Sequence, residues 1–322
     1  MTTRSGSRVI ALEEHYWDAG VAEHFAGRNS TRSSDLLERL YDVAELRLKE
    51  MDEAGIDVQV LSHGAPSTQR LDADIGPGVA AVANDRLRET VQTHPDRFAA
   101  FAALATANPK AAADELERAV TRLGFKGAMI HGLTNGRFCD GKEFWPIFER
   151  AEALGVPIYI HPGYPHPDVI EAYYRDYLDE FPALATAGWG YTVETATQGI
   201  RLVLSGVFDA YPDLQIILGH LGESLPFSLW RIDQALSRKE NRRASSFRDT
   251  FSSHFHITTS GNFSDPALQC CVMEMGVDRI MFSVDYPFVE NQPGVDWIEQ
   301  VSLSAEDREK ILNGNVTRLL KL

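Results

Sequence analysis

Short apolar segments recur along the chain, and longer segments with helical spacing separate them. The apolar segments are rich in β-branched residues and contain few polar positions, as expected for parallel strands buried on both faces. They are 9–12, 58–62, 98–104, 127–130, 156–160, 214–218, 256–259 and 280–284. Helical patterns occupy 36–54, 79–93, 111–123, 143–154, 196–210 and 306–322. Eight predicted strands with helical segments between them fit a (β/α)₈ barrel.

The predicted architecture is one α/β domain, a TIM barrel over residues 1–322 with loop insertions over the carboxyl-terminal face of the strands. An open, doubly wound sheet is the competing fold, but no Gly-x-Gly-x-x-Gly follows the first strand. The long intervals 15–34 and 164–195 contain many aromatic residues. Loops at these places would cover the mouth of the barrel.

Charge and composition narrow the classes of partner. The chain has 31 Lys and Arg against 46 Asp and Glu, a net charge of −15, which disfavours contact with nucleic acid phosphates. No apolar stretch approaches the ~20 residues of a membrane span, and the apolar run near the N-terminus is too short for a secretory signal. Three cysteines, Cys139, Cys270 and Cys271, do not indicate a disulfide framework. We expect a cytoplasmic protein that binds neither nucleic acid nor membrane.

Polar residues at the ends of predicted strands carry the candidate chemistry. Glu13, His15, His161 and Asp285 each follow an apolar segment, and in a barrel the carboxyl ends of all strands meet at one face. Strand periodicity places Glu13 and His15 on the same side, which we expect to be the inward one, and Glu14 on the other, so the spacing favours Glu13 over Glu14. Two imidazoles and two carboxylates at one point suit a single divalent ion, Zn, Fe or Mn. The alternative for any one histidine is a structural hydrogen bond.

Several further residues have two interpretations each. His220 and Glu223 are close enough in sequence for the carboxylate to fix the imidazole tautomer, either for catalysis or simply to close a loop. His63 and His131 follow predicted strands and would reach the mouth as substrate contacts. Arg231 would bind an anionic substrate or pair with Asp233. Aromatic residues at the mouth, such as Phe288, Tyr164 and Trp189, would bind a flat ring or pack a lid.

These motifs resemble a known family. The chain is similar to the decarboxylase branch of the amidohydrolase superfamily, in particular to γ-resorcylate and other dihydroxybenzoate decarboxylases, over nearly its whole length. The matching motifs are Glu13-x-His15, His161-Pro162, Gly219-His220-Leu221-Gly222-Glu223, Trp230-Arg231-Ile232-Asp233 and Ser283-Val284-Asp285-Tyr286-Pro287-Phe288. Other members of the superfamily begin with His-x-His, whereas this chain has Glu13 in place of the first histidine, as the decarboxylase branch does.

The resemblance implies a carboxy-lyase that removes CO₂ from an ortho-hydroxy aromatic carboxylic acid without oxidation, often reversibly. It also implies one Zn or Mn ion per subunit, held by Glu13, His15, His161 and Asp285. Asp285 would deliver the proton to the ring, with His220 and Glu223 supporting proton transfer and Arg231 assisting. The family commonly forms homodimers or homotetramers.

Two departures concern the substrate. Related decarboxylases have His-Pro-Arg where this chain has His161-Pro162-Gly163, and an Asn where it has Leu236. The metal-ligand pattern is unaffected by either change. Two competing interpretations are a metal-dependent hydrolase or lactonase of the same superfamily, in which His220 or Asp285 would activate a water, and a barrel that binds a small molecule without catalysis.

Overall fold

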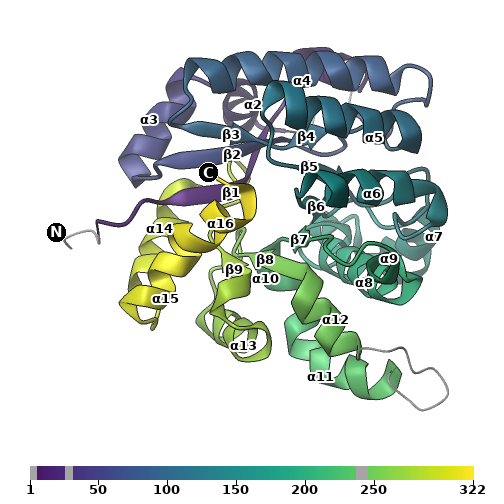
Figure 1. Ribbon diagram of the computed structural model, residues 1–322. Coiled ribbons are helices and arrows are strands. Elements are labelled where there is room, and N and C mark those ends of the chain that lie inside the picture. Colours follow the sequence, from purple (N-terminus) through teal and green to yellow (C-terminus); the bar gives the residue numbers. More distant parts are fainter. Residues whose placement is uncertain (1–5, 26–31, 237–245) are drawn as a thin grey trace.

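Parallel strands follow one another in sequence order, and helices cover their outer side (Figure 1). The computed structural model describes residues 6–25, 32–236 and 246–322. Its strands are β1 (Ile10–Tyr16), β2 (Val58–His63), β3 (Phe98–Ala100), β4 (Ala102–Ala103), β5 (Ala128–His131), β6 (Ile158–His161), β7 (Ile216–Leu218), β8 (Phe255–Thr258) and β9 (Ile280–Met281). Phe101 interrupts a single strand to give β3 and β4, so eight strand positions result, as predicted. The (β/α)₈ prediction is confirmed.

The helices between the strands largely follow the predicted ranges. They are α1 (Ala19–Glu23), α2 (Ser34–Tyr41), α3 (Glu45–Ala54), α4 (Gly76–Thr93), α5 (Pro109–Arg118), α6 (Trp145–Leu154), α8 (Gly190–Ser205), α9 (Val207–Ala210), α11 (Leu225–Leu236), α12 (Phe247–His254), α13 (Asp265–Met275), α14 (Asn291–Gln300), α15 (Ala305–Glu309) and α16 (Asn315–Leu320). In the described ranges every helix is too short or too polar to span a bilayer. The cysteines are free thiols, as expected.

The single helix predicted at 36–54 is wrong, because the chain breaks at Asp42. The Asp42 backbone is extended, and its carboxylate accepts hydrogen bonds from the amides of Ala44 and Arg47. This local bonding competes with helix continuation. The break separates α2 from α3, and Arg47 on α3 then points under the first strand.

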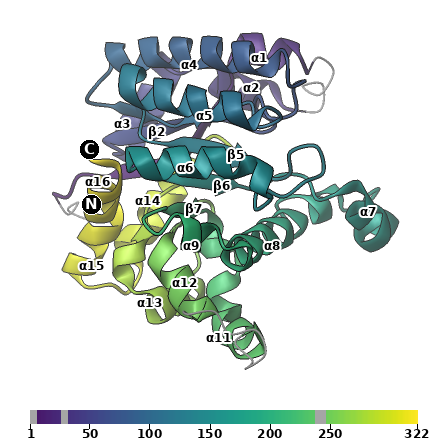
Figure 2. The same cartoon turned by 45° about the vertical axis from the view of Figure 1, so that its right-hand side comes forward.

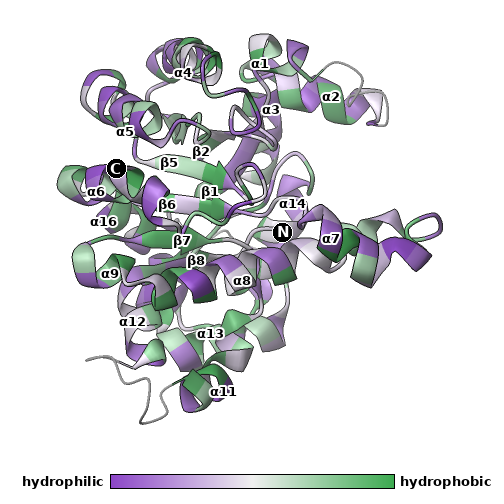
Figure 3. Cartoon of the chain, turned by 90° about the vertical axis from the view of Figure 1, so that its right-hand side faces the viewer, coloured by the Kyte–Doolittle hydropathy of each residue, from purple (hydrophilic) through white to green (hydrophobic). Residues whose placement is uncertain are grey.

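The two predicted roof segments differ from each other. In the interval 164–195, the short helices α7 (Pro167–Val169), η4 (Ile170–Tyr174), η5 (Arg175–Tyr177) and η6 (Pro182–Ala185) form an arm that projects from the barrel (Figures 2 and 3). Its residues Tyr173 and Tyr177 are 71% and 60% exposed, so only the base of the arm reaches the mouth. In the interval 15–34, α1 lies beside α4, and residues 26–31 lie outside the described ranges.

Two hydrophobic clusters lie on the two sides of the barrel wall. The inner cluster fills the barrel with Ile10, Leu12, Val58, Val60, Ala99, Phe101, Met129, Tyr159, Ile217 and Met281. Val316 and Leu320 of α16 join it from the amino-terminal end of the strands. The outer cluster joins the strands to the surrounding helices, along which hydrophilic and hydrophobic residues alternate (Figure 3). The barrel is therefore closed at one end by packed side chains, which leaves the opposite end for a site.

The last strand segment meets the first through one buried side chain. Glu14, fully buried, accepts hydrogen bonds from the Ser283 hydroxyl and from the amides of Val284 and Tyr286, at 3.1, 2.9 and 3.1 Å. The amide of His15 donates to the Tyr286 carbonyl at 2.6 Å. Burial raises the pKa of Glu14 to about 8, against the lowering effect of these three donors. The Glu14 carboxyl group thus joins β1 to the segment that follows β9.

His256, at the amino-terminal end of the barrel, generates a prediction about stability and pH. Its Nε2 accepts from Arg279 at 3.0 Å, and burial together with Arg279 and Arg318 lowers its pKa to about 3. The unfolded chain binds a proton at this histidine near pH 6.5, whereas the folded chain does not until far lower pH. Folded stability from this residue is therefore lost as pH falls below about 6.5.

The glutamine in His256→Gln can still accept a hydrogen bond from Arg279 but does not bind a proton. We therefore expect the unfolding free energy of this variant to depend less on pH than that of the wild type. Between pH 7 and pH 5 the unfolding free energy of the wild type should fall by on the order of 1–2 kcal/mol more than that of the variant. Urea unfolding at each pH measures the difference. His24→Gln, at an exposed position, is the matched control, and parallel curves for wild type and His256→Gln would contradict the prediction.

Candidate metal centre

An irregularity in β1 decides which side chains enter the centre. Ala11 pairs with Gln59 and Glu14 pairs with Leu61, so β1 has one more residue than β2 over this stretch. Such a bulge reverses the alternation of side chains beyond it. Ile10 and Leu12 face the barrel interior, and an unbroken strand would turn Glu14 inward. Because of the bulge, Glu13 and His15 point to the centre instead.

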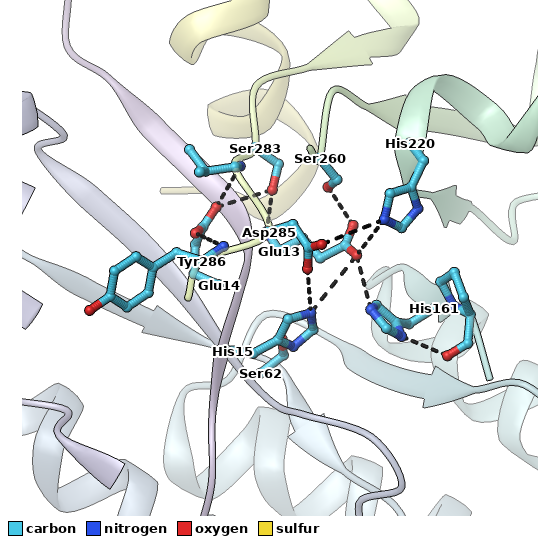
Figure 4. Close-up of polar contacts among 12 residues, drawn as sticks. Glu13, Glu14, His15, Ser62, His161, His220, Ser260, Ser283, Asp285 and Tyr286 are labelled. Carbon is cyan, nitrogen blue, oxygen red and sulfur yellow. Dashed lines mark hydrogen bonds and ion pairs between the residues drawn. The ribbon is translucent and has the colours of Figure 1, made fainter. Parts of the chain in front are cut away.

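The four predicted ligands lie together at the carboxyl ends of their strands (Figure 4). One ligand atom from each of Glu13, His15, His161 and Asp285 lies within 4.8 Å of the others. His161 Nε2 is 3.1 Å from Glu13 Oε1, and His15 Nε2 is 3.3 Å from Asp285 Oδ1. All four side chains are buried or nearly so. The atoms that face one another are the types that coordinate a divalent transition ion.

The hydrogen bonding of these residues leaves the facing atoms free. Among the described residues, Glu13 Oε1, His15 Nε2 and Asp285 Oδ1 are buried without a hydrogen-bond partner. Buried polar atoms are rarely left in that state. A divalent ion would satisfy all three at once, so the residues present fit a metal ion.

Surrounding groups hold the ligands in orientation. Glu13 Oε2 accepts from the hydroxyls of Tyr159 and Ser260, which directs Oε1 to the centre. His15 Nδ1 lies 3.2 Å from the Ser62 hydroxyl. His161 Nδ1 lies 2.8 Å from the Pro162 carbonyl, which fixes this nitrogen as the donor and leaves Nε2 for a ligand.

Electrostatics keep the two carboxylates ionised. Burial alone would raise the pKa of Glu13 and of Asp285, but the neighbouring imidazoles outweigh it and the pKa of each is lowered. Burial opposes protonation of His15, yet Asp285 and Glu13 raise its pKa to about 9. Carboxylates that are charged at neutral pH are the form that binds a cation.

His220 and Glu223 lie on a strained turn beside the cluster. Residues 220–224 all have positive φ, between 49° and 74°, and only Gly222 adopts this region without steric cost. The turn brings His220 Nδ1 to 2.6 Å from Glu223 Oε1 and leaves His220 Nε2 at 3.9 Å from Asp285 Oδ2. Burial would lower the pKa of His220, but Glu223 and Glu13 raise it well above its ordinary value. Of the two interpretations, the geometry favours an imidazole oriented toward the cluster.

A cavity of about 530 Å³ adjoins the cluster. His131 forms the connection, because its Nδ1 lies 2.9 Å from His161 Nδ1 while its Nε2 donates to the His63 carbonyl. The polar and aromatic residues that line the cavity are Trp17, Phe25, Arg32, His63, Arg70, His131, Tyr164 and Tyr191. This volume suits a small aromatic ligand.

The three predicted substrate contacts have different positions. His63 lines the cavity, but its Nε2 accepts from the Asp18 amide and its Nδ1 donates to the Gly64 carbonyl. Burial lowers its pKa to about 4, so it presents a neutral ring with both nitrogens engaged. The Phe288 ring lies 5.6 Å from the His15 ring, at the rim of the cluster.

Within one chain, Arg231 lies away from the cavity. It lies exposed on α11, which packs on α12 and α13 outside the barrel, and it is not among the lining residues. The structure gives no support, within a single chain, to the prediction that Arg231 binds substrate.

Three residues of the site and its cavity, Tyr159, Ser260 and Arg32, were not predicted from the sequence. Tyr159 and Ser260 orient Glu13, and Tyr159 was detectable, because it precedes His161 by two positions on the same strand face. Arg32 lines the cavity from a segment without strand or helix periodicity, so no pattern marked it.

Comparison with known proteins gives consistent relatives. A family model described as Amidohydrolase matches residues 14–322. The gamma-resorcylate decarboxylase of Polaromonas sp. is 40% identical, over 97% of this chain and 98% of its own. A solved dihydroxybenzoic acid decarboxylase from Polaromonas sp. JS666, with bound manganese and the inhibitor 2-nitroresorcinol, superposes with a TM-score of 0.89 at 39% identity, covering 98% of this chain and 97% of that one.

A second solved structure also aligns with nearly the whole of this chain. It is a 5-carboxyvanillate decarboxylase from Novosphingobium aromaticivorans, complexed with manganese and 4-hydroxy-3-methoxy-5-nitrobenzoic acid. Its TM-score is 0.91 at 32% identity, and the alignment covers 98% of this chain and 97% of that chain.

The bulge in β1 predicts different effects for two neighbouring glutamates. Glu13→Gln should lower metal content at least ~10-fold, because it replaces a charged ligand at the centre. Glu14→Gln should retain the metal but lower the unfolding free energy by about 1–3 kcal/mol, because its amide NH₂ must face one of three donors.

Elemental analysis and urea unfolding of both variants measure these effects. Glu53→Gln, whose side chain is 64% exposed, is the matched control for both measurements. Metal loss in Glu14→Gln with retention in Glu13→Gln would show that the assignment of the two side chains is reversed.

Proposed function

The chain belongs to the amidohydrolase family, and from this premise we propose that it is a metal-dependent, nonoxidative decarboxylase of ortho-hydroxybenzoates, that is, a carboxy-lyase. The observation that carries the proposal is the set of four facing ligand atoms, three of them buried without partners, beside a cavity of aromatic-ligand size. The full-length likeness to a gamma-resorcylate decarboxylase supports the reaction class. We treat residues 1–322 as a single domain.

Glu13, His15, His161 and Asp285 would hold one divalent ion per subunit. Manganese is supported by its presence in two related structures, and the imidazole and carboxylate donors also suit zinc. When bound, the ion supplies positive charge that orients the substrate oxygens and stabilises negative charge on them.

Asp285 is ionised before turnover, and we assign it to take a proton from the His220 imidazolium and to pass that proton to the ring. The proton goes to the carbon that bears the carboxylate; the bond to CO₂ then breaks, and its electron pair restores the aromatic ring. A general acid is required because a ring carbon is a weak base at neutral pH. The Asp285 backbone has φ 76°, a left-handed conformation that directs its carboxylate to the cluster.

His220 is the residue we assign to return a proton to Asp285. Its Nε2 is 3.9 Å from Asp285 Oδ2, and a modest movement of either side chain makes the contact direct. Glu223 holds the opposite ring nitrogen and stabilises the imidazolium. Phe288, Tyr164 and Trp17 would flank the substrate ring and exclude water from the reacting carbon.

We also infer a homodimer or homotetramer in the cytoplasm, with a small aromatic carboxylate as ligand and no nucleic acid or membrane partner. Phe227 and Trp230 on α11 and Met273 on α13 are 85%, 59% and 82% exposed. Contiguous exposed apolar side chains of this size are typical of interaction surfaces. The net charge of −15 argues against nucleic acid.

Replacement of the proposed acid should stop turnover without unfolding the protein. Asp285→Asn keeps the volume of the side chain but cannot deliver an acid proton, so we expect kcat for CO₂ release to fall by about 10²–10⁴-fold. Circular dichroism checks that the fold is retained, and turnover is expressed per bound ion, because Asp285 is also a proposed ligand. Asp278→Asn, at a position where the side chain is 63% exposed, is the control; unchanged turnover in Asp285→Asn would remove the assignment.

A substrate panel tests the reaction class against the hydrolase alternative. Metal-loaded protein should release CO₂ from 2,6-dihydroxybenzoate and related hydroxybenzoates but should not open lactones or esters. Removal of the ion by a chelator should abolish CO₂ release, and readdition of Mn²⁺ should restore it. Hydrolysis of the lactone panel without any CO₂ from the first would replace the proposed function by the alternative.

A further inference from the structure

The cavity has a charge opposite to that of the protein. The chain carries 15 more acidic than basic residues, yet among the described residues no Asp or Glu lines the cavity, whereas Arg32 and Arg70 both do. Buried or half-buried charges of one sign in a concave site concentrate ligands of the opposite sign. The cavity therefore favours an anion.

Arg32 is placed as a binding group within this wall. Its guanidinium carbon lies 4.8 Å from the centre of the Trp17 ring and 5.2 Å from that of Phe288. Among the described residues no carboxylate forms an ion pair with it, and the nearby polar groups are the phenols of Tyr164 and Tyr191. Two aromatic faces hold the guanidinium, and in the described part of the chain no carboxylate competes for its N–H groups, so it is placed to bind an oxyanion.

The position of Arg32 relative to the metal centre indicates which part of a ligand it meets. The Phe288 ring lies near both, 5.6 Å from the His15 ring and 5.2 Å from the Arg32 guanidinium carbon. These two distances place the Arg32 guanidinium carbon within about 11 Å of the His15 ring centre, a span that one substituted benzene ring can reach across. The reacting carboxylate and its ortho hydroxyl would face the centre, and the far edge of the ring would face Arg32.

We propose that Arg32 is a specificity-determining residue that binds a second anionic substituent on the far edge of the substrate ring. The preferred substrates are thus ortho-hydroxybenzoates with an additional carboxylate. This inference rests on the proposed function, which places the first carboxylate at the metal centre.

A different role for Arg32, as the group that holds the departing carboxylate, is disfavoured by energetics. An arginine paired with that carboxylate stabilises the charged reactant more than the neutral CO₂ that leaves, and so raises the barrier. An arginine on a carboxylate that persists through the reaction lowers KM without this penalty.

Binding of unreactive analogues tests the proposal directly. In 4-hydroxy-3-nitrobenzoate the nitro group replaces the departing carboxylate and the second carboxylate remains; 4-hydroxy-3-nitrobenzamide differs only in having an uncharged amide there. Calorimetry with manganese-loaded protein should give a Kd at least ~10-fold lower for the acid than for the amide. Arg32→Gln should remove this preference, Arg32→Lys should keep part of it, and the control Arg122→Gln, at an exposed position away from the cavity, should keep all of it.

The amide is also the internal control for folding, because Arg32→Gln should bind it with a Kd within ~3-fold of the wild type. If wild type binds acid and amide equally, or if Arg32→Gln weakens both to the same extent, the proposal is overturned.

Turnover separates this proposal from the proposed function. Release of CO₂ is measured with 4-hydroxyisophthalate and with 5-carbamoylsalicylate, in wild type and Arg32→Gln. We expect kcat/KM for the first to fall about 10–100-fold in the variant and that for the second to change little. CO₂ from neither substrate nor from the hydroxybenzoate panel in wild type would reject decarboxylation, while the analogue binding still decides the role of Arg32. CO₂ from both, with equal losses in the variant, would reject only the role of Arg32.

Discussion

Burial of two carboxylates at one point is the constraint on which the site depends. Glu13 is fully buried and Asp285 lies against it, so each would lose its charge unless other groups compensated. Tyr159 and Ser260 satisfy one oxygen of Glu13, and imidazoles face the other. What remains uncompensated is a small space surrounded by candidate ligand atoms, whose negative charge a divalent cation would neutralise. In the proposed function, a bound ion would therefore offset the free-energy cost of this burial.

The same constraint couples the site to the closure of the barrel. Glu14 is also fully buried, and its three hydrogen bonds hold the segment 283–286 that carries Asp285. Arg47, buried beneath, donates to the His15 carbonyl at 2.5 Å and lies over the Tyr286 ring at 4.6 Å. Polar groups that stabilise the contact between the first and last strands therefore also position two of the ligands. Stability and ligand geometry cannot be changed independently at this point.

Two further features of the site are a strained backbone turn and a cavity wall whose charge is opposite to that of the protein. Four of the five residues in the left-handed turn 220–224 have a side chain, and each costs roughly 1–2 kcal/mol relative to a right-handed conformation. Hydrogen bonding between His220 and Glu223 and close packing of Leu221 offset part of this cost. The protein as a whole has a negative net charge, whereas the charged residues described in the cavity wall are the two arginines Arg32 and Arg70. Strain and charge of this kind, concentrated beside one cluster, are typical of sites selected for binding and chemistry.

The sequence by itself determined the alternation of strands and helices and the gathering of polar strand-end residues, the candidate ligands, at one face. Buried parallel strands must be apolar, and the polar residues that end them must meet at one face, so both follow from local pattern. Other features depend on contacts between distant segments. The bulge in β1, stabilised by the bond from the Glu13 amide to the Ser283 hydroxyl, chose Glu13 over Glu14, although the pattern of Ile10 and Leu12 pointed to the reverse.

Tertiary structure also decided the positions of the arginines, because a long, solvated side chain leaves no periodic trace in the sequence. Arg231 stands next to a recognisable motif yet lies exposed on α11, whereas Arg32, in a segment without pattern, lines the cavity. Local hydrophobic periodicity records which residues are buried against the core. It does not record which polar side chains the folded chain brings to the mouth, because that depends on how loops distant in sequence pack against one another.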